Sequence, residues 1–490
     1  MDSEHPFLIP RLSIIRETCM LATIVCTQVI VLAGLAQGIF PDVAIGRTLG
    51  TDGSTESLWG PAAYGLTSGA FMLPAGRIGD MYGHRSCYIG AWVWMALASF
   101  LTGISAFYHS FVFYAVCRGL QGMAAAMLVP CALAILALVY KEGPRKNLAF
   151  SLFAAGSPVG FTLGGLFSGL IEAHGWWPWI FWATSIACGS LVIGSLLSIP
   201  KLHEFDKEPE QQAQSISTPE KASFRRDFDW VGTLIGVSGL VLFNVAWNLA
   251  PEKGWNAPST ITTVIIGLIL LAAFPFVELR VRQPLVPIGR LSSKSLFVLA
   301  VIACIFASFG ILIFYLVNFI IRLRNGSALE AAAQFVPISF AGLAASYLNS
   351  FLLKNKIQPA SILSFSCIWF IVGNVLLATM PANQTYWAQA FWANVLSPLG
   401  IDLSFPSATL LMSQLVPPKE QGIAASLIAT VVYYSQSIGL GIAGTVETRV
   451  ADGSLMKGYR GAFYTGIGLS TLGFLLSLWP VLQLHLDRKK

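Results

Sequence analysis

Charged residues are scarce in this chain. Only 11% of its 490 residues are Asp, Glu, Lys or Arg, whereas 55% are hydrophobic. Soluble proteins carry about 25% charged residues. A chain with so little charge cannot cover its surface with polar side chains, which predicts that its solvent is lipid. The net charge of +6 is modest. No basic cluster interleaved with aromatics occurs, so nucleic acid is not expected as a partner.

The chain also lacks the groupings that carry most enzyme chemistry. Its eight cysteines are scattered through apolar segments without metal-ligand spacing, which predicts small core side chains, no metal and no cofactor. Neither a Ser/His constellation nor a Walker A loop is present, so we expect neither an enzyme nor a directly ATP-driven pump. No convincing cleavage site follows the first apolar run, so a signal peptide is not expected.

Long apolar runs are what the sequence has in abundance. Each is about as long as a membrane-spanning helix, which rises about 1.5 Å per residue. The runs fall at 18–40, 58–76, 87–107, 111–139, 148–171, 178–199, 230–250, 260–279, 295–320, 331–352, 359–380, 387–413, 422–446 and 461–484. They predict an all-α polytopic membrane protein with fourteen spanning segments.

Basic residues in the loops indicate an orientation. With a cytosolic N-terminus, Lys and Arg favour the cytosolic side by about three to one, as the positive-inside rule requires. The basic residues on the outer side are Arg47, Lys253, Arg322, Arg324, Arg449, Lys457 and Arg460. The N-glycosylation sequons at Asn325 and Asn383 also fall in outer loops. Both termini are therefore expected in the cytosol, with the plasma membrane as the main expectation and the vacuolar membrane as the alternative.

A polar stretch at 201–227 divides the chain and is predicted to be a solvated linker. The last six runs repeat features of the first six: Ala149 and Gly164 recur as Ala424 and Gly439, 275 residues later. This favours a parallel repeat. The expected domains are a cytosolic N-terminus at 1–17, a six-helix bundle at 18–199, a cytosolic linker at 200–229, two extra helices at 230–279, a second six-helix bundle at 295–484 and a cytosolic tail at 485–490.

The predicted inner loop at 76–85 reads GRIGDMYGHR. Gly76 and Gly83 permit a tight turn between two helices. Asp80 can cap the following helix or pair with a cation, and Arg85 helps to hold the loop inside. We interpret the segment as a conformational-switch loop, with a generic charged turn as the alternative.

Two charged residues lie well inside predicted spans, away from the span ends. Arg118 opens the sequence RGLQG in the fourth run, and a charge there costs several kcal/mol unless it is paired or hydrated. Asp402 in the twelfth run is the only carboxylate near the middle of a predicted helix. Both are predicted to take part in proton coupling. The alternatives are an Arg that snorkels to the helix end and a protonated Asp bonded to a neighbouring helix.

Glycines are concentrated in the fifth run. The segment 156–165 reads GSPVGFTLGG, with Gly156, Gly160, Gly164 and Gly165. Glycines four residues apart share one helix face and let two backbones approach closely. This suits a helix that bends or slides during transport, and a tight packing seam without a kinetic role is the alternative.

These motifs resemble those of the major facilitator superfamily. The segment 76–85 is similar to its signature loop, 118–122 to its second motif, and 156–165 to the glycine-rich motif associated with antiporters, although Phe161 stands where that family has Pro. With the order of six, two and six helices, the chain resembles the fourteen-helix drug:proton antiporter branch. Within that branch, it is most similar to fungal proteins related to aminotriazole-resistance transporters.

The resemblance implies a major facilitator fold of two six-helix bundles plus two additional central helices. It also implies a monomer in the lipid bilayer that exports a toxic organic compound or secondary metabolite in exchange for protons. Transport of a small inorganic solute such as borate or ammonium is the alternative. Related drug antiporters often carry an acid in the first helix, where this chain has none, so the expected coupling shifts to Asp402 and Arg118. Candidates for the substrate pocket, each with a structural role as the alternative, are Gln37, Asn244, Asn318, Asn394 and Tyr433.

Overall fold

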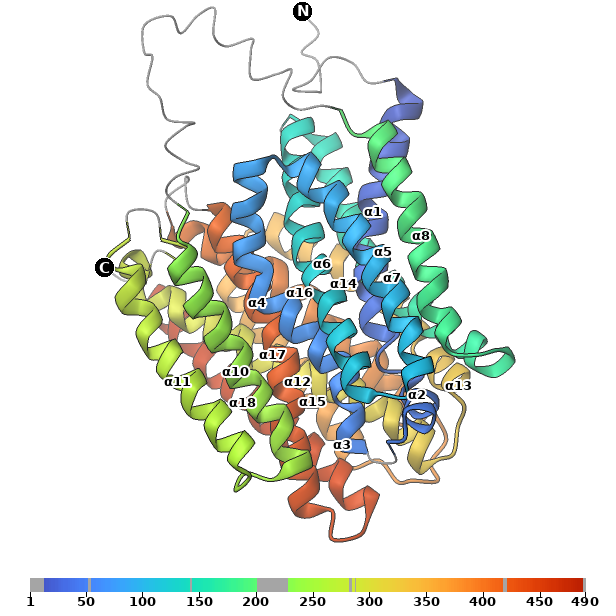
Figure 1. The fold of residues 1–490 in the computed structure, drawn as a ribbon. Coiled ribbons are helices and arrows are strands. Elements are labelled where there is room, and N and C mark those ends of the chain that lie inside the picture. Colours follow the sequence, from blue (N-terminus) through green and yellow to red (C-terminus); the bar gives the residue numbers. More distant parts are fainter. Residues whose placement is uncertain are drawn as a thin grey trace, which may run out of the picture.

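The computed structural model describes residues 13–51, 54–141, 143–200, 228–281, 284–286, 288–416 and 421–487. These residues are almost entirely helical, as lipid demands, because a helix satisfies its own backbone hydrogen bonds. Figure 1 shows the long helices running side by side along one direction. The expected N-terminus, linker and C-terminal tail lie partly or mostly outside the described residues. The domain boundaries therefore stay a prediction.

Six long helices precede residue 200. They are α1 (Ile14–Ala36), α4 (Trp59–Tyr82), α5 (His84–Tyr108), α6 (Phe111–Val139), α7 (Pro144–His174) and α8 (Pro178–Ser198). The short helices α2 (Asp42–Leu49) and α3 (Ser54–Ser57) lie between α1 and α4. We call this group of helices the N-terminal half.

The helices from residue 293 onward form the C-terminal half. They are α12 (Ser293–Asn318), α13 (Ala328–Gln334), α14 (Val336–Lys354), α15 (Pro359–Ala378), α16 (Ala390–Leu415), α17 (Gln421–Val450) and α18 (Leu455–Asp487). A π-helical turn, η4 (Phe319–Leu323), extends α12, and a short 3-10 turn, η3 (Ile288–Arg290), precedes it. Between the halves come α10 (Trp230–Lys253) and α11 (Pro258–Glu278), drawn green in Figure 1. They pack on each other, and α10 also packs on α4 and α17.

Thirteen of the described helical segments are long and apolar enough to cross a membrane. The remaining predicted span corresponds to α4, which has 24 helical residues but is less apolar than the others. Most of its residues are buried, because α4 packs between α6 and α17. A helix covered by other helices needs little apolar surface towards lipid, so its glycines and polar side chains are tolerated.

The two halves meet along two pairs of contacts. Helix α4 packs against α17, and α7 packs against α13 and α14. Three aromatic rings pack together across the contact between the halves. Phe161 of α7 lies 5.7 Å from Phe40 and 5.9 Å from Phe335, measured between ring centroids. Helices α2, α3 and α13 lie at one end of the bundle, the lower end in Figure 1, and we call it the α2 end.

Candidate functional site

Asp402 lies in the middle of α16, next to the contact between the halves. A Cβ at Gly342 of α14 would lie 3.0 Å from Asp402 Oδ2 and 3.3 Å from the ring of Pro158 in α7. Asp402 is half-buried, and within the described residues no hydrogen bond or ion pair engages its carboxylate. A carboxylate of the C-terminal half therefore faces the N-terminal half across a position that has no side chain.

Two prolines flank Asp402 within α16. Pro398 lies one turn before it and Pro406 one turn after it. Because proline has no N–H, the carbonyl of Asp402 lacks its usual donor four residues later. In membrane helices, such a carbonyl is tolerated where protein or water satisfies it. The helix is therefore weakened at the residue that bears the unpaired carboxylate.

Hydroxyl groups bridge the halves beside this position. Ser339 of α14 donates to the Pro158 carbonyl at 3.0 Å, and its Oγ lies 2.7 Å from Thr162 Oγ1. The glycine motif of α7 and the helix that covers Asp402 therefore meet in one seam. Sequence reasoning missed Gly342 and Ser339, because a single glycine or serine in an apolar run carries no signal of its own.

Arg118 is completely buried in α6 and bonds to backbone carbonyls. Its guanidinium donates to Gly34 O at 2.6 Å, to Gly60 O at 3.1 Å and to Gln121 Oε1 at 2.5 Å. The central guanidinium carbon, Cζ, lies 4.7 Å from the centroid of the Tyr64 ring, in cation–π geometry. The charge is thus held by α1, α4 and α6 without any carboxylate from the described residues, and it does not snorkel to solvent.

The predicted loop at 76–85 is mostly helical: residues 76–82 form the last turns of α4, residues 84 and 85 begin α5, and only Gly83 lies between the two helices. Gly83 has φ 90°, a conformation that favours glycine. Asp80 does not cap α5; instead, its Oδ1 lies 3.2 Å from His84 Nε2. Arg85 donates to the Ile199 carbonyl at 3.0 Å, where it stabilises the C-terminal end of α8.

Residues near the C-terminal end of α4 contact the segment between α11 and α12 and also the C-terminal half. Arg77 donates to the Pro284 carbonyl at 3.1 Å. A Cβ at Gly76 would lie 3.5 Å from Ser426 Oγ of α17. A movement between the halves would therefore change the contacts of this segment. Its role as a conformational switch stays a prediction.

The glycine motif of α7 forms a seam with α1. A Cβ at Gly156 would lie 3.1 Å from the Val25 carbonyl, and one at Gly160 or Gly164 would overlap the backbone of α1. The residues of α1 that they meet are Val25, Val29 and Ala33, also four apart. Gly165 faces the ring of Phe40 instead. The glycines thus allow close packing within the N-terminal half.

We expect Gly164→Ala to destabilise the protein by about 1–3 kcal/mol, because the added methyl group overlaps Ala33 in a packed seam. Gly189→Ala in α8 is the control, since nothing lies within 4 Å of that position. Thermal unfolding of the purified protein in detergent measures both changes. Equal melting temperatures for the two variants would contradict the seam.

All five predicted pocket side chains are buried. Gln37 donates to Thr184 Oγ1 of α8 at 2.7 Å, and Asn394 donates to the Gln334 carbonyl at 2.8 Å. No hydrogen bond within the described residues uses the Tyr433 hydroxyl. None of these three side chains bonds to Asp402 in the part of the chain that the structure describes. Their place in a pocket stays a prediction.

The other two pocket candidates are hydrogen-bonded as well, Asn244 between helices and Asn318 within α12 and its π-helical turn. Asn244 of α10 accepts from Ser437 Oγ of α17 at 2.9 Å and from Asn248 Nδ2 at 2.8 Å. These hydrogen bonds hold α10 against α17. Asn318 donates to the Phe314 carbonyl at 3.1 Å and accepts from Arg322 Nε at 2.7 Å.

The arrangement of the helices and the motif loops can be compared with known proteins. The model of the Major Facilitator Superfamily matches residues 25–440. The chain belongs to this superfamily. It is thus a multi-pass membrane transporter of small-molecule substrates, not an enzyme.

Similar proteins within the superfamily show which kinds of transporter the chain resembles. The chain is 42% identical to the low affinity ammonium transporter of Saccharomyces cerevisiae over 98% of its length and 91% of the relative. It is 36% identical to the efflux pump terJ of Aspergillus terreus, with 96% and 89% covered. The aminotriazole resistance protein of Saccharomyces cerevisiae is 35% identical, with 94% and 83% covered. The chain therefore resembles efflux and resistance proteins, as the motifs predicted, and also an ammonium transporter, in line with the alternative.

Solved structures support the fold. The chain matches the crystal structure of the POT family transporter PepTSo with a TM-score of 0.66 at 12% identity, covering 98% of this chain and 99% of that one. At this identity, the match shows the shared fold alone. The predicted major facilitator fold is confirmed.

Proposed function

We propose that this transporter exports a toxic organic compound or secondary metabolite in exchange for protons, with Asp402 as the carboxylate that carries the proton. The supporting observation is the lone Asp402 carboxylate beside Gly342 and Pro158. An unpaired charge inside a membrane bundle raises the free energy of the protein, and protonation of the Asp402 carboxylate removes this charge. Because the seam between the halves must open in each cycle of alternating access, a proton bound there changes the energy of that step.

Arg118 is proposed to assist the coupling as a fixed positive charge. Three acceptors hold its guanidinium, so it stays charged while its surroundings change. Its carbonyl partners come from α1 and α4, and α4 lies against the C-terminal half. Movement of α4 would therefore change the contacts of Arg118.

The cargo is proposed from the relatives. A resistance protein and an efflux pump cover nearly the whole chain, which favours export of organic compounds. Deletion of the gene is expected to increase sensitivity to aminotriazole or to decrease secretion of a metabolite. Unchanged resistance to organic compounds together with unchanged secretion would contradict this cargo.

Ammonium is the second candidate cargo. The observation in its favour is the 42% identity to an ammonium transporter over 98% of the chain. A carboxylate that can take a proton can also pair with a small cation. Methylammonium flux in the deletion strain separates the candidates, since loss of this flux with unchanged aminotriazole resistance selects ammonium.

We propose that the α2 end faces the outside and that both termini are cytosolic, in the plasma membrane and as a monomer. The sequon residues Asn325 and Asn383 are exposed, and Arg324 donates to the Ala382 carbonyl at 2.8 Å, so both sequons lie at one end. Glycosidase treatment is expected to increase the gel mobility of the wild-type chain, and Asn325→Gln with Asn383→Gln should abolish this shift. An unglycosylated wild type that reacts at its termini with an impermeant outer reagent would reverse the orientation.

A further inference from the structure

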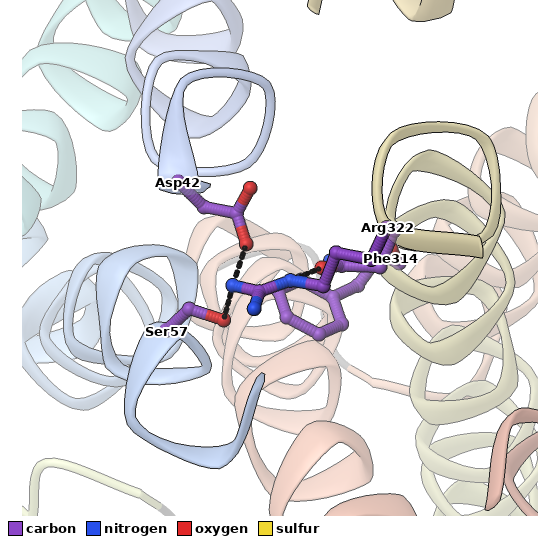
Figure 2. Close-up of polar contacts among 5 residues, drawn as sticks. Asp42, Ser57, Phe314 and Arg322 are labelled. Atoms are coloured by element: carbon purple, nitrogen blue, oxygen red, sulfur yellow. Dashed lines mark hydrogen bonds and ion pairs between the residues drawn. The ribbon is translucent and has the colours of Figure 1, made fainter. Parts of the chain in front are cut away.

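An ion pair joins the two halves at the α2 end. Arg322 Nη2 lies 3.0 Å from Asp42 Oδ2, and these residues are 280 positions apart in the chain. Figure 2 shows Arg322 reaching from its π turn towards Asp42 and Ser57, whose Oγ accepts a hydrogen bond at 3.3 Å. The sequence pattern had placed Arg322 among the outer loop charges, but its side chain points into the protein.

Arg322 is positioned by its own half. The π-helical turn that carries it continues α12 directly, and such turns are frequent at functional sites. Asn318, one turn earlier, accepts from Arg322 Nε at 2.7 Å. The guanidinium is therefore a tethered cation that the C-terminal half inserts into the N-terminal half.

Asp42 has capacity for a second cation contact. Its side chain is only 2% exposed, and Oδ1 has no hydrogen-bond partner within the described structure. Burial raises the pKa of the Asp42 carboxyl, while the charge of Arg322 lowers it. The carboxylate thus depends on a nearby cation for its charge.

The surroundings of the pair are acidic. Glu172 of α7 interacts electrostatically with Asp42 and with Arg47 of α2. Glu447 of α17 accepts from the Tyr315 hydroxyl at 2.8 Å, and Tyr459 of α18 interacts electrostatically with Glu447, Arg322 and Asp42. If the halves separate at this end, Arg322 leaves with the C-terminal half, and the carboxylates of the N-terminal half lose the cation that neutralises Asp42.

We propose that Asp42 is a cation-binding site at the α2 end, which Arg322 occupies when this end is closed and which a small ammonium-type cation occupies when it opens. The pair then acts as a gate that a cationic cargo opens by competition. This inference rests on the second candidate function, transport of ammonium.

Methylammonium binding to the purified full-length protein tests the site. Thermal stabilisation by methylammonium chloride is compared with that by sodium chloride at equal ionic strength. Arg322→Gln removes the tethered competitor, so methylammonium should bind about tenfold more tightly. Asp42→Asn removes the acceptor, so binding should weaken by about tenfold or be lost. A purely structural pair would weaken binding in both variants, and that result would overturn the proposal.

A matched control is available in the exposed pair of Asp452 and Lys457, whose side chains are 85% and 61% exposed. Asp452→Asn should bind methylammonium like the wild type. Size-exclusion chromatography identifies variants that do not fold. If either variant aggregates, wild-type binding alone decides: stabilisation by sodium equal to that by methylammonium overturns the site. Aminotriazole transport that depends on Asp402, with methylammonium binding insensitive to Asp42→Asn, would remove this site and leave the main proposed function intact.

Discussion

Asp402→Asn is expected to lower transport driven by a pH gradient by more than about tenfold while the protein is made in normal amounts. The amide keeps the shape of the side chain but cannot take up or release a proton. It also removes an unpaired carboxylate from the bundle, so the variant should be at least as stable as the wild type. The assay is accumulation of radiolabelled aminotriazole or methylammonium in proteoliposomes with an imposed pH gradient.

The control for this variant is Asp452→Asn, which removes a carboxylate whose side chain is 85% exposed. It should transport like the wild type. If Asp402→Asn accumulated cargo at the wild-type rate under the same gradient, Asp402 would not carry the coupling proton. A protonated aspartate with a purely structural role would then be the better interpretation.

Arg118→Lys is expected to inactivate the transporter and to destabilise it by about 2–4 kcal/mol, even though the charge is kept. One ammonium group cannot reach the Gly34 carbonyl, the Gly60 carbonyl and Gln121 together, as the planar guanidinium does. Buried acceptors would lose their donors. Thermal unfolding and transport measure the two effects.

Arg449→Gln is the matched control, because Arg449 is exposed at the end of α17. It should change neither stability nor transport. Wild-type behaviour of Arg118→Lys would show that any buried positive charge suffices at this position, and the carbonyl contacts would then have no special role.

Particular residues show how far the sequence could predict the structure. The apolar runs located the spanning helices, because lipid selects length and apolarity in one segment at a time. Asp402 stood out for the same reason, as a lone acid in an apolar run. Asn244 and Asn394 stood out equally, but they bond to neighbouring helices and not to Asp402. Which neighbour a helix face meets is a property of tertiary packing, which one sequence does not display.

The contact between the halves could not be predicted from the sequence, for a further reason. Gly342 matters because Asp402 and Pro158 converge on it from other helices. The pair of Asp42 and Arg322 joins segments 280 residues apart, and a pattern within either segment cannot indicate the other. Phe161 departs from the Pro of the antiporter motif, and the structure shows its ring packed against Phe335 of the other half.

Proton movement by the wild-type protein tests the central claim most directly. Proteoliposomes loaded with a pH-sensitive dye are given a gradient of aminotriazole or methylammonium and no pH gradient. The dye should report proton movement opposite to that of the transported cargo, and Asp402→Asn should give no such signal. Cargo flux through the wild-type protein without any proton movement would contradict coupling through Asp402.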